Sequence, residues 1–111
     1  MAPHEKRAST RYEVELEMEV VAGDQSVTAQ AVNLSLGGAL VRIPTERPLR
    51  VGARIGVSFR LPDLDKPLVA KADVRWVDDG DPEVVGFQFV TGFRAKETWA
   101  LGRFLERHKP T

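Results

Sequence analysis

The feature that most constrains the fold of this chain is an unbroken alternation of apolar and acidic residues between Tyr12 and Val21. One face would carry Tyr12, Val14, Leu16, Met18 and Val20, and the other Glu13, Glu15, Glu17 and Glu19. Because successive side chains of a strand point to opposite faces, this pattern predicts a half-buried β-strand. Its acidic outer face would discourage pairing with other chains.

Similar alternation predicts five further strands, over residues 25–34, 39–43, 54–61, 68–77 and 84–90. In the fifth predicted strand (68–77), the alternation places Trp76 on the same inward face as Val74. Phe59, Phe87 and Phe89 also fall on inward faces. Six short strands joined by tight turns predict an all-β fold, a six-stranded antiparallel barrel, because closure removes exposed edges.

The hydrophobic period changes after residue 93. Leu101, Phe104, Leu105 and His108 recur at helical spacing, which predicts a C-terminal helix over residues 94–108 that packs on the barrel or caps one end. His108 would lie near the terminal carbonyls of that helix. Residues 1–11 lack apolar periodicity and predict a flexible basic arm. The expected organisation is one domain: arm 1–11, barrel 12–91 and helix 94–108.

The composition narrows the classes of partner and location. Sixteen Lys and Arg balance sixteen Asp and Glu in 111 residues, so the net charge does not favour a long nucleic acid as partner. Cysteine is absent, which excludes disulfides and thiolate metal sites. No apolar run has the length of a membrane span, and the N-terminus lacks the apolar core of a signal peptide. We therefore expect a cytoplasmic protein that does not insert into membranes.

Catalysis is not indicated by any motif. The chain has no P-loop, no dinucleotide-binding fingerprint and no spaced set of His and carboxylate residues. Asp78, Asp79 and Asp81 around Gly80 are more typical of a hairpin turn than of a cation site. We expect no enzyme activity, no metal and no cofactor.

Two segments carry candidate binding residues. Arg7 and Arg11 lie four residues apart, and guanidinium groups bind phosphate oxygens and the O6/N7 edge of guanine. The alternative for this pair is a solubilising basic tail. In the segment Asn33 to Gly38, an extended backbone would point Asn33 and Ser35 outward and the two leucines, 34 and 36, into the core. Glycines 37 and 38 would permit positive φ and close approach of a ligand; the alternative is a simple strand–turn–strand connection.

Together these segments resemble the signatures of the PilZ domain family, Arg-x-x-x-Arg followed by Asp/Asn-x-Ser-x-x-Gly. Gly52, the string Val74-Arg75-Trp76 and the string Gly86-Phe87-Gln88-Phe89 fit the same pattern. The resemblance implies a receptor for cyclic di-GMP, the bacterial second messenger. It further implies that Arg7 and Arg11 grip phosphates and the guanine Hoogsteen edge.

The same resemblance assigns the remaining site residues. Asn33 and Ser35 would hydrogen-bond the base or its neighbouring groups, and Gly38 would keep the surface open. Lys6 would influence whether one ligand or a stacked pair binds. Gly37 belongs to the motif, and Trp76 would either line the site or belong to the core.

Ligand binding would order the arm and signal in trans to a partner protein that controls motility, pili or exopolysaccharide. We expect a monomer or a weak homodimer. One alternative is a PilZ-like protein–protein adaptor that binds no ligand. Another is a small barrel for single-stranded nucleic acid, which would need a basic groove with exposed aromatic residues; the inward placement of the phenylalanines argues against it.

Overall fold

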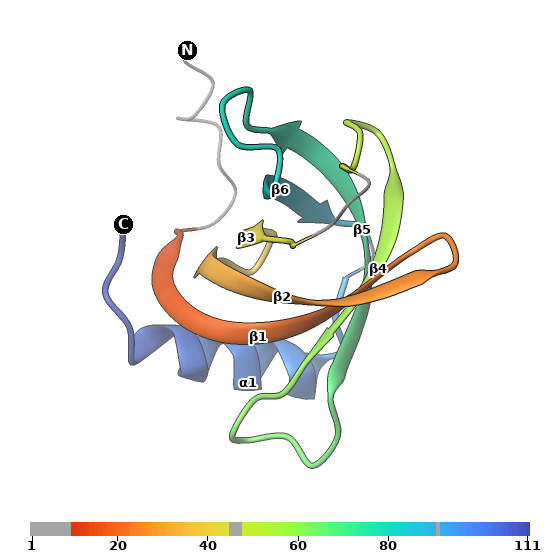
Figure 1. Cartoon of the computed structure of the whole chain (residues 1–111). Coiled ribbons are helices and arrows are strands. Elements are labelled where there is room, and N and C mark those ends of the chain that lie inside the picture. Colours follow the sequence, from red (N-terminus) through yellow and green to blue (C-terminus); the bar gives the residue numbers. More distant parts are fainter. Residues whose placement is uncertain (1–9, 45–47, 91) are drawn as a thin grey trace.

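The computed structural model describes residues 10–44, 48–90 and 92–111. It contains β1 (Tyr12–Ala22), β2 (Gln25–Leu34), β3 (Gly38–Arg42), β4 (Arg54–Phe59), β5 (Leu68–Val77), β6 (Val84–Phe89) and α1 (Ala95–Glu106). The strands close into a barrel in the order β1-β2-β3-β6-β5-β4, and each neighbouring pair is antiparallel (Figure 1). The predicted six-stranded antiparallel barrel with a C-terminal helix is confirmed.

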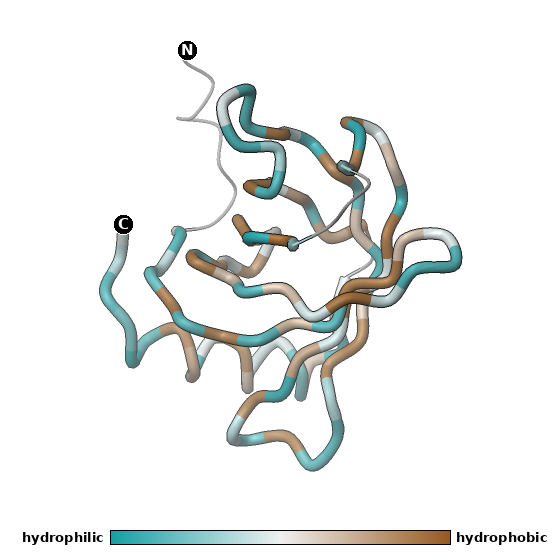
Figure 2. The backbone as a smooth tube through the Cα atoms, viewed as in Figure 1, coloured by the Kyte–Doolittle hydropathy of each residue, from teal (hydrophilic) through white to brown (hydrophobic). Residues whose placement is uncertain are grey.

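The core lies inside the barrel, where the apolar face of each strand meets the others. Val14, Met18 and Val20 of β1 are all buried, whereas the glutamates between them are exposed. Figure 2 shows the same alternation of apolar and polar residues along the strands. Helix α1 adds Leu101 and Leu105 to this core, and burying a leucine side chain stabilises a fold by about 1.5–3 kcal/mol.

Strand β5 contains a β-bulge that changes which of its side chains face outward. Val74 pairs with Phe87, but Trp76 pairs with Gly86, so Arg75 is an extra residue between two successive pairs. An inserted residue shifts the alternation by one position. The side chain of Trp76 is 47% exposed and lies on the outer surface of the barrel. The inward placement predicted from alternation is therefore wrong, as is the alternative that Trp76 is a core residue.

The C-terminal segment returns to the beginning of β1 (Figure 1). Tyr12 and Pro110 form an isolated antiparallel bridge beyond the end of α1. The His108 Nδ1 atom lies 2.9 Å from the carbonyl oxygen of Phe104, so this ring contacts a terminal carbonyl of the helix as predicted. In the ranges described, no helix combines the length and the apolar character that a membrane crossing requires.

Candidate functional site

The turn between β2 and β3 is held by the side chain of Ser35. The Ser35 Oγ atom accepts hydrogen bonds from the backbone N–H groups of Gly37 (3.0 Å) and Gly38 (3.1 Å). The Ser35 backbone N–H in turn donates to the carbonyl of Gly38 at 2.9 Å. Since a serine hydroxyl next to a turn commonly replaces a backbone partner in this way, Ser35 determines the shape of the turn.

This turn changes the predicted orientation of two side chains. Strand β2 ends at Leu34, which is fully buried as expected. The following residues do not continue the alternation: Ser35 is only 5% exposed, and Leu36 is 42% exposed. The expectation that Ser35 points outward and Leu36 into the core is wrong, because the chain turns at Ser35 to satisfy its own backbone donors.

Gly38 is required by the close approach of two strands. A Cβ atom at this position would lie 2.1 Å from the carbonyl oxygen of Phe87 in β6, far inside van der Waals contact. The backbone of Gly38 does not adopt a positive φ, unlike Gly23 and Gly52. The positive φ considered for this glycine is therefore not found. The missing side chain serves the pairing of β3 with β6 instead.

A row of four paired residues crosses the outer face of the barrel beside this turn. Asn33 pairs with Leu40, Leu40 with Gly86, and Gly86 with Trp76. At Gly86 a Cβ would lie 3.7 Å from the Trp76 ring and 3.8 Å from a methyl group of Leu40. We call Asn33, Leu40, Gly86 and Trp76 the outer row. Across the strands, this row presents in order an amide, an aliphatic side chain, backbone without a side chain, and an indole ring.

Arg11 reaches one end of the outer row. Its Nη1 atom donates a hydrogen bond to the Oδ1 atom of Asn33 over 3.1 Å, although the two residues are 22 positions apart. The two predicted binding segments therefore meet on one surface. Lys6 and Arg7 lie outside the described residues.

The chemistry of this surface suits a planar, anionic ligand. A guanidinium group offers a fixed fork of donors to phosphate oxygens or to a guanine edge, and an exposed indole offers a stacking surface. Sequence reasoning did not assign Leu40 and Gly86 to the site. The available signal was the glycine inside a strand, which often marks close approach of another group.

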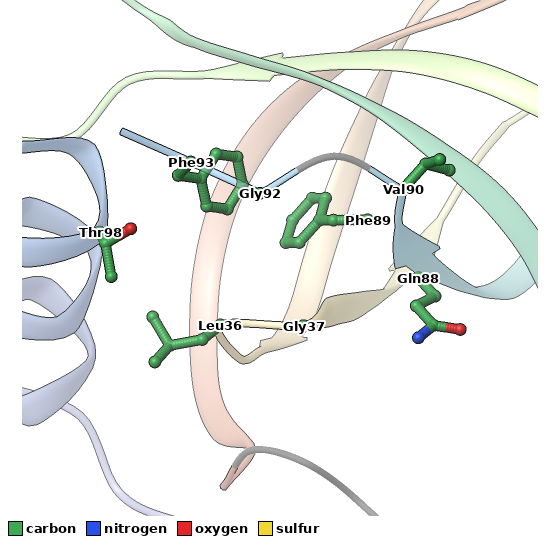
Figure 3. A pocket seen from close by; sticks show the side chains of 8 residues that line it. All are labelled: Leu36, Gly37, Gln88, Phe89, Val90, Gly92, Phe93 and Thr98. Carbon is green, nitrogen blue, oxygen red and sulfur yellow. The ribbon is translucent and has the colours of Figure 1, made fainter. Parts of the chain in front are cut away.

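An apolar pocket of about 370 Å³ lies on the other side of the turn, between it and the beginning of α1 (Figure 3). Its lining residues are mainly apolar or small: Leu36, Gly37, Gln88, Phe89, Val90, Gly92, Phe93 and Thr98. The rings of Phe89 and Phe93 meet edge to face with their centroids 5.1 Å apart. We call this cavity the Leu36 pocket. It has no charged side chain in its lining and so offers no partner for a phosphate.

In the acidic hairpin between β5 and β6, one carboxylate accepts hydrogen bonds from other groups of the protein. Asp81 accepts a hydrogen bond from the guanidinium group of Arg42 at 2.8 Å and another from the backbone N–H of Glu83 at 3.2 Å. These bonds, that of Arg42 first, hold the pKa of Asp81 below its usual value. Asp81 therefore functions as a turn residue. Within the described part of the chain, no cluster of three or more His, Cys, Asp or Glu side chains is placed to hold a metal ion.

Solved structures with the same fold include three proteins of low sequence identity to this chain. The inhibitor of motility MotI/DgrA from Bacillus subtilis has a TM-score of 0.74 at 17% identity, over 92% of this chain and 50% of that protein. This chain thus spans about half the length of MotI. The PilZ domain of CeSA from a cellulose-synthesizing bacterium has a TM-score of 0.65 at 19% identity, over 87% and 95% of the two chains.

The third structure is the PilZ domain of YcgR from Escherichia coli with c-di-GMP, with a TM-score of 0.67 at 18% identity over 92% of each chain. No curated protein matches the sequence of this chain. The family model described as PilZ domain matches residues 5–107. On the strength of this match over nearly its whole length, the chain belongs to the PilZ domain family.

Proposed function

We propose that this chain is a receptor for cyclic di-GMP that binds the ligand between its arginine-bearing arm and the outer row. The observation that carries the proposal is the contact between Arg11 and Asn33, because it joins the two family motifs on one surface. Membership of the PilZ family supports the choice of ligand. So does the likeness to the YcgR domain, whose structure contains c-di-GMP.

Each residue of the site has a distinct role in this proposal. Arg7 and Arg11 bind phosphate oxygens and the Hoogsteen edge of guanine. Asn33 orients Arg11 and offers its amide to the ligand. Trp76 stacks on a base beside the bare backbone of Gly86, a role that its exposure on the outer face permits.

The remaining predicted residues act through the shape of the surface. Ser35 and the two glycines of the turn hold Asn33 and the beginning of β3 in place, with the Ser35 hydroxyl engaged inside the turn. Lys6 keeps its predicted influence on whether one ligand or a stacked pair binds.

The energetics require several contacts at once. If binding orders about six residues of the arm, the backbone entropy costs roughly 6–12 kcal/mol, at about 1–2 kcal/mol per residue. A micromolar affinity needs a further net gain of about 8 kcal/mol. Hydrogen bonds to charged groups contribute only about 1.5–3 kcal/mol each. Both arginines and the stacking surface must therefore act together.

The output of binding would be a change in the shape and charge of one surface, which a partner protein reads. An ordered arm differs from a mobile one in the groups that it presents, and such order–disorder transitions are common switches. Control of motility, pili or exopolysaccharide is the proposed process. A cytoplasmic location, the absence of enzyme activity, and a monomeric or weakly dimeric state stay predictions from the sequence.

Calorimetric titration with cyclic di-GMP tests the proposal, with GMP as the control ligand and the stoichiometry recorded. We expect saturable binding of cyclic di-GMP and none of GMP. Arg7→Ala and Arg11→Ala should each abolish measurable binding, whereas Glu15→Ala, on the exposed face of β1, should not change it. An intact protein that does not bind cyclic di-GMP would favour the ligand-independent adaptor. Near-normal affinity of either arginine variant would refute the proposed contacts.

A further inference from the structure

Residues 109–111 form a short strand-like segment beside Arg11 and the first two residues of β1, Tyr12 and Glu13. The backbone N–H of Glu13 donates to the carbonyl of Lys109 at 2.8 Å, and the backbone N–H of Thr111 donates to the carbonyl of Arg11 at 2.9 Å. The Thr111 hydroxyl also donates to the Arg11 carbonyl, at 3.3 Å. We call residues 109–111 the tail.

Arg11 is thereby held through two different parts of the residue. Its carbonyl accepts the two bonds from Thr111, and its side chain donates to Asn33. Tyr12, the next residue, pairs with Leu34 of β2 and forms the bridge to Pro110 of the tail. The tail and β2 thus flank the point at which the arm joins the barrel.

We propose that the tail is a positioning element of the ligand site: by fixing the backbone of Arg11, it presents the guanidinium group to the outer row before the ligand arrives. This inference rests on the proposed function for its consequence in binding. The placement of Arg11 on Asn33 by the tail is a property of the protein without ligand and can be measured separately.

The expected effect follows from preorganisation. A residue whose backbone is already fixed loses less conformational entropy when a ligand binds it. If the tail no longer holds Arg11, its backbone loses this conformational entropy when the ligand binds, and the affinity falls. We expect about a tenfold loss of affinity. The free energy of restraining the backbone of one residue, like that of forming one hydrogen bond, corresponds to a change of about that size in a binding constant.

A purely structural role for the tail makes a different prediction. If Lys109, Pro110 and Thr111 served only to stabilise the barrel, their loss would lower thermal stability and leave the affinity of the folded protein unchanged. All three side chains are exposed, and the helix that carries the tail is anchored separately by Leu101 and Leu105. Removal of the tail bonds should therefore change stability little.

A matched pair of substitutions at Thr111 isolates the backbone bond. Thr111→Pro removes both the N–H donor and the hydroxyl, whereas Thr111→Val keeps the N–H and the β-branched shape. We expect Thr111→Pro to bind cyclic di-GMP about tenfold more weakly and Thr111→Val less than about threefold more weakly. Both should melt within about 3 °C of the parent protein.

Asparagine 33 supplies a second measurement that does not depend on the ligand. It is the one asparagine of the sequence, so its side-chain amide signals in an ¹H–¹⁵N NMR spectrum can be assigned by substitution. Thr111→Pro should shift these signals because it alters the Arg11 contact, and Thr111→Val should leave them in place. The indole signal of Trp99, exposed on α1, serves as the internal control.

The outcomes separate the two proposals. If the parent protein binds no cyclic di-GMP but the Asn33 signals move in Thr111→Pro alone, the proposed function fails and the positioning by the tail holds. If the parent protein binds the ligand, and Thr111→Pro retains both its affinity and its Asn33 signals, the positioning role is overturned. Loss of affinity to the same extent in both variants would overturn the role of the backbone bond, because the hydroxyl, which both variants lack, would then account for the whole effect.

Discussion

The two sides of the turn from Ser35 to Gly38 differ in the chemistry of the residues that they present. On one side, the outer row joins Asn33 and its Arg11 contact to an exposed indole. On the other side, the Leu36 pocket of about 370 Å³ has only apolar and neutral polar residues in its lining. A dianionic nucleotide is bound best by a cationic donor beside a stacking surface, and of these two sides the outer row has that donor, the guanidinium group of Arg11.

The turn itself lies between the outer row and the Leu36 pocket. Its hydroxyl and backbone groups bond to one another, so the turn gives shape to the surface without offering the ligand many open donors. Changes in the turn should therefore act first on stability and only through it on binding. Changes in the outer row should act on binding, and changes in the Leu36 pocket on packing.

The largest effect is expected for Gly38→Ala. The new methyl group would collide with the carbonyl oxygen of Phe87 and push β3 away from β6. We expect the free energy of unfolding to fall by about 3 kcal/mol, as for other overpacked sites. Chemical denaturation measures this. Gly102→Ala is the matched control, because a methyl group there meets no atom within 4 Å and alanine favours a helix; an equal loss in both variants would contradict the role given to Gly38.

Ser35→Ala should come next. It leaves the backbone N–H groups of Gly37 and Gly38 without the oxygen that they bond. Unpaired buried donors cost about 1–3 kcal/mol, so we expect stability to fall by about 2 kcal/mol. Affinity should fall as the turn loosens. Ser35→Thr retains the hydroxyl and should recover part of the stability, and an alanine variant as stable as the parent would show that the turn does not depend on this side chain.

The variants Trp76→Ala and Phe93→Ala, one on each side of the turn, compare the two sides directly. Trp76 is half-exposed on the outer row, so its loss should weaken cyclic di-GMP binding about tenfold and change stability little. Phe93 packs against Phe89 in the Leu36 pocket, so its loss should lower stability and leave the affinity of the folded protein intact. Titration and thermal melting of both variants are the measurements. The division of roles would be broken if Phe93→Ala lost affinity and Trp76→Ala did not.

The smallest effect is expected at Asp81, in the hairpin between β5 and β6. The hydrogen bond from Arg42 lowers the pKa of Asp81, so the folded state binds this proton less readily than the unfolded chain. The resulting stabilisation is present above the ordinary value of 3.8 and is lost as the pH falls through the lowered pKa. Asp81→Asn should therefore reduce the melting temperature slightly at pH 7 and not at all at the acidic end. Melting curves across pH check this, and a pH-independent difference would contradict it.

Much of the fold could be predicted from the sequence because burial on one face of each strand imposes a period of two. The predicted strand over residues 68–77 coincides with β5, yet the side chain of Trp76 was placed on the wrong face. Alternation cannot reveal a bulge such as that at Arg75, because the extra residue is fixed by the pairing with β6. The helix was predicted two residues too long at its C-terminal end, where ends commonly fray.

The candidate site was predicted in part for a similar reason. The motif pattern identified Asn33 and Arg11, but their contact depends on how the barrel closes, which no local pattern contains. Ser35 is predicted to point outward only if the alternation of side chains continues beyond Leu34, whereas the chain turns there. The pairing of Leu40 and Gly86 beside Trp76 is a consequence of strand order and register, so it became visible only in the folded chain.

The most direct test of the division between the two sides is an NMR map of the cyclic di-GMP complex. Backbone and side-chain signals are followed during titration of the labelled protein. We predict that the largest shifts occur at Arg11, Asn33, Leu40, Gly86 and the Trp76 indole. Shifts confined to Leu36, Phe89, Phe93 and Thr98, with the outer row unchanged, would place the ligand in the Leu36 pocket and contradict binding at the outer row.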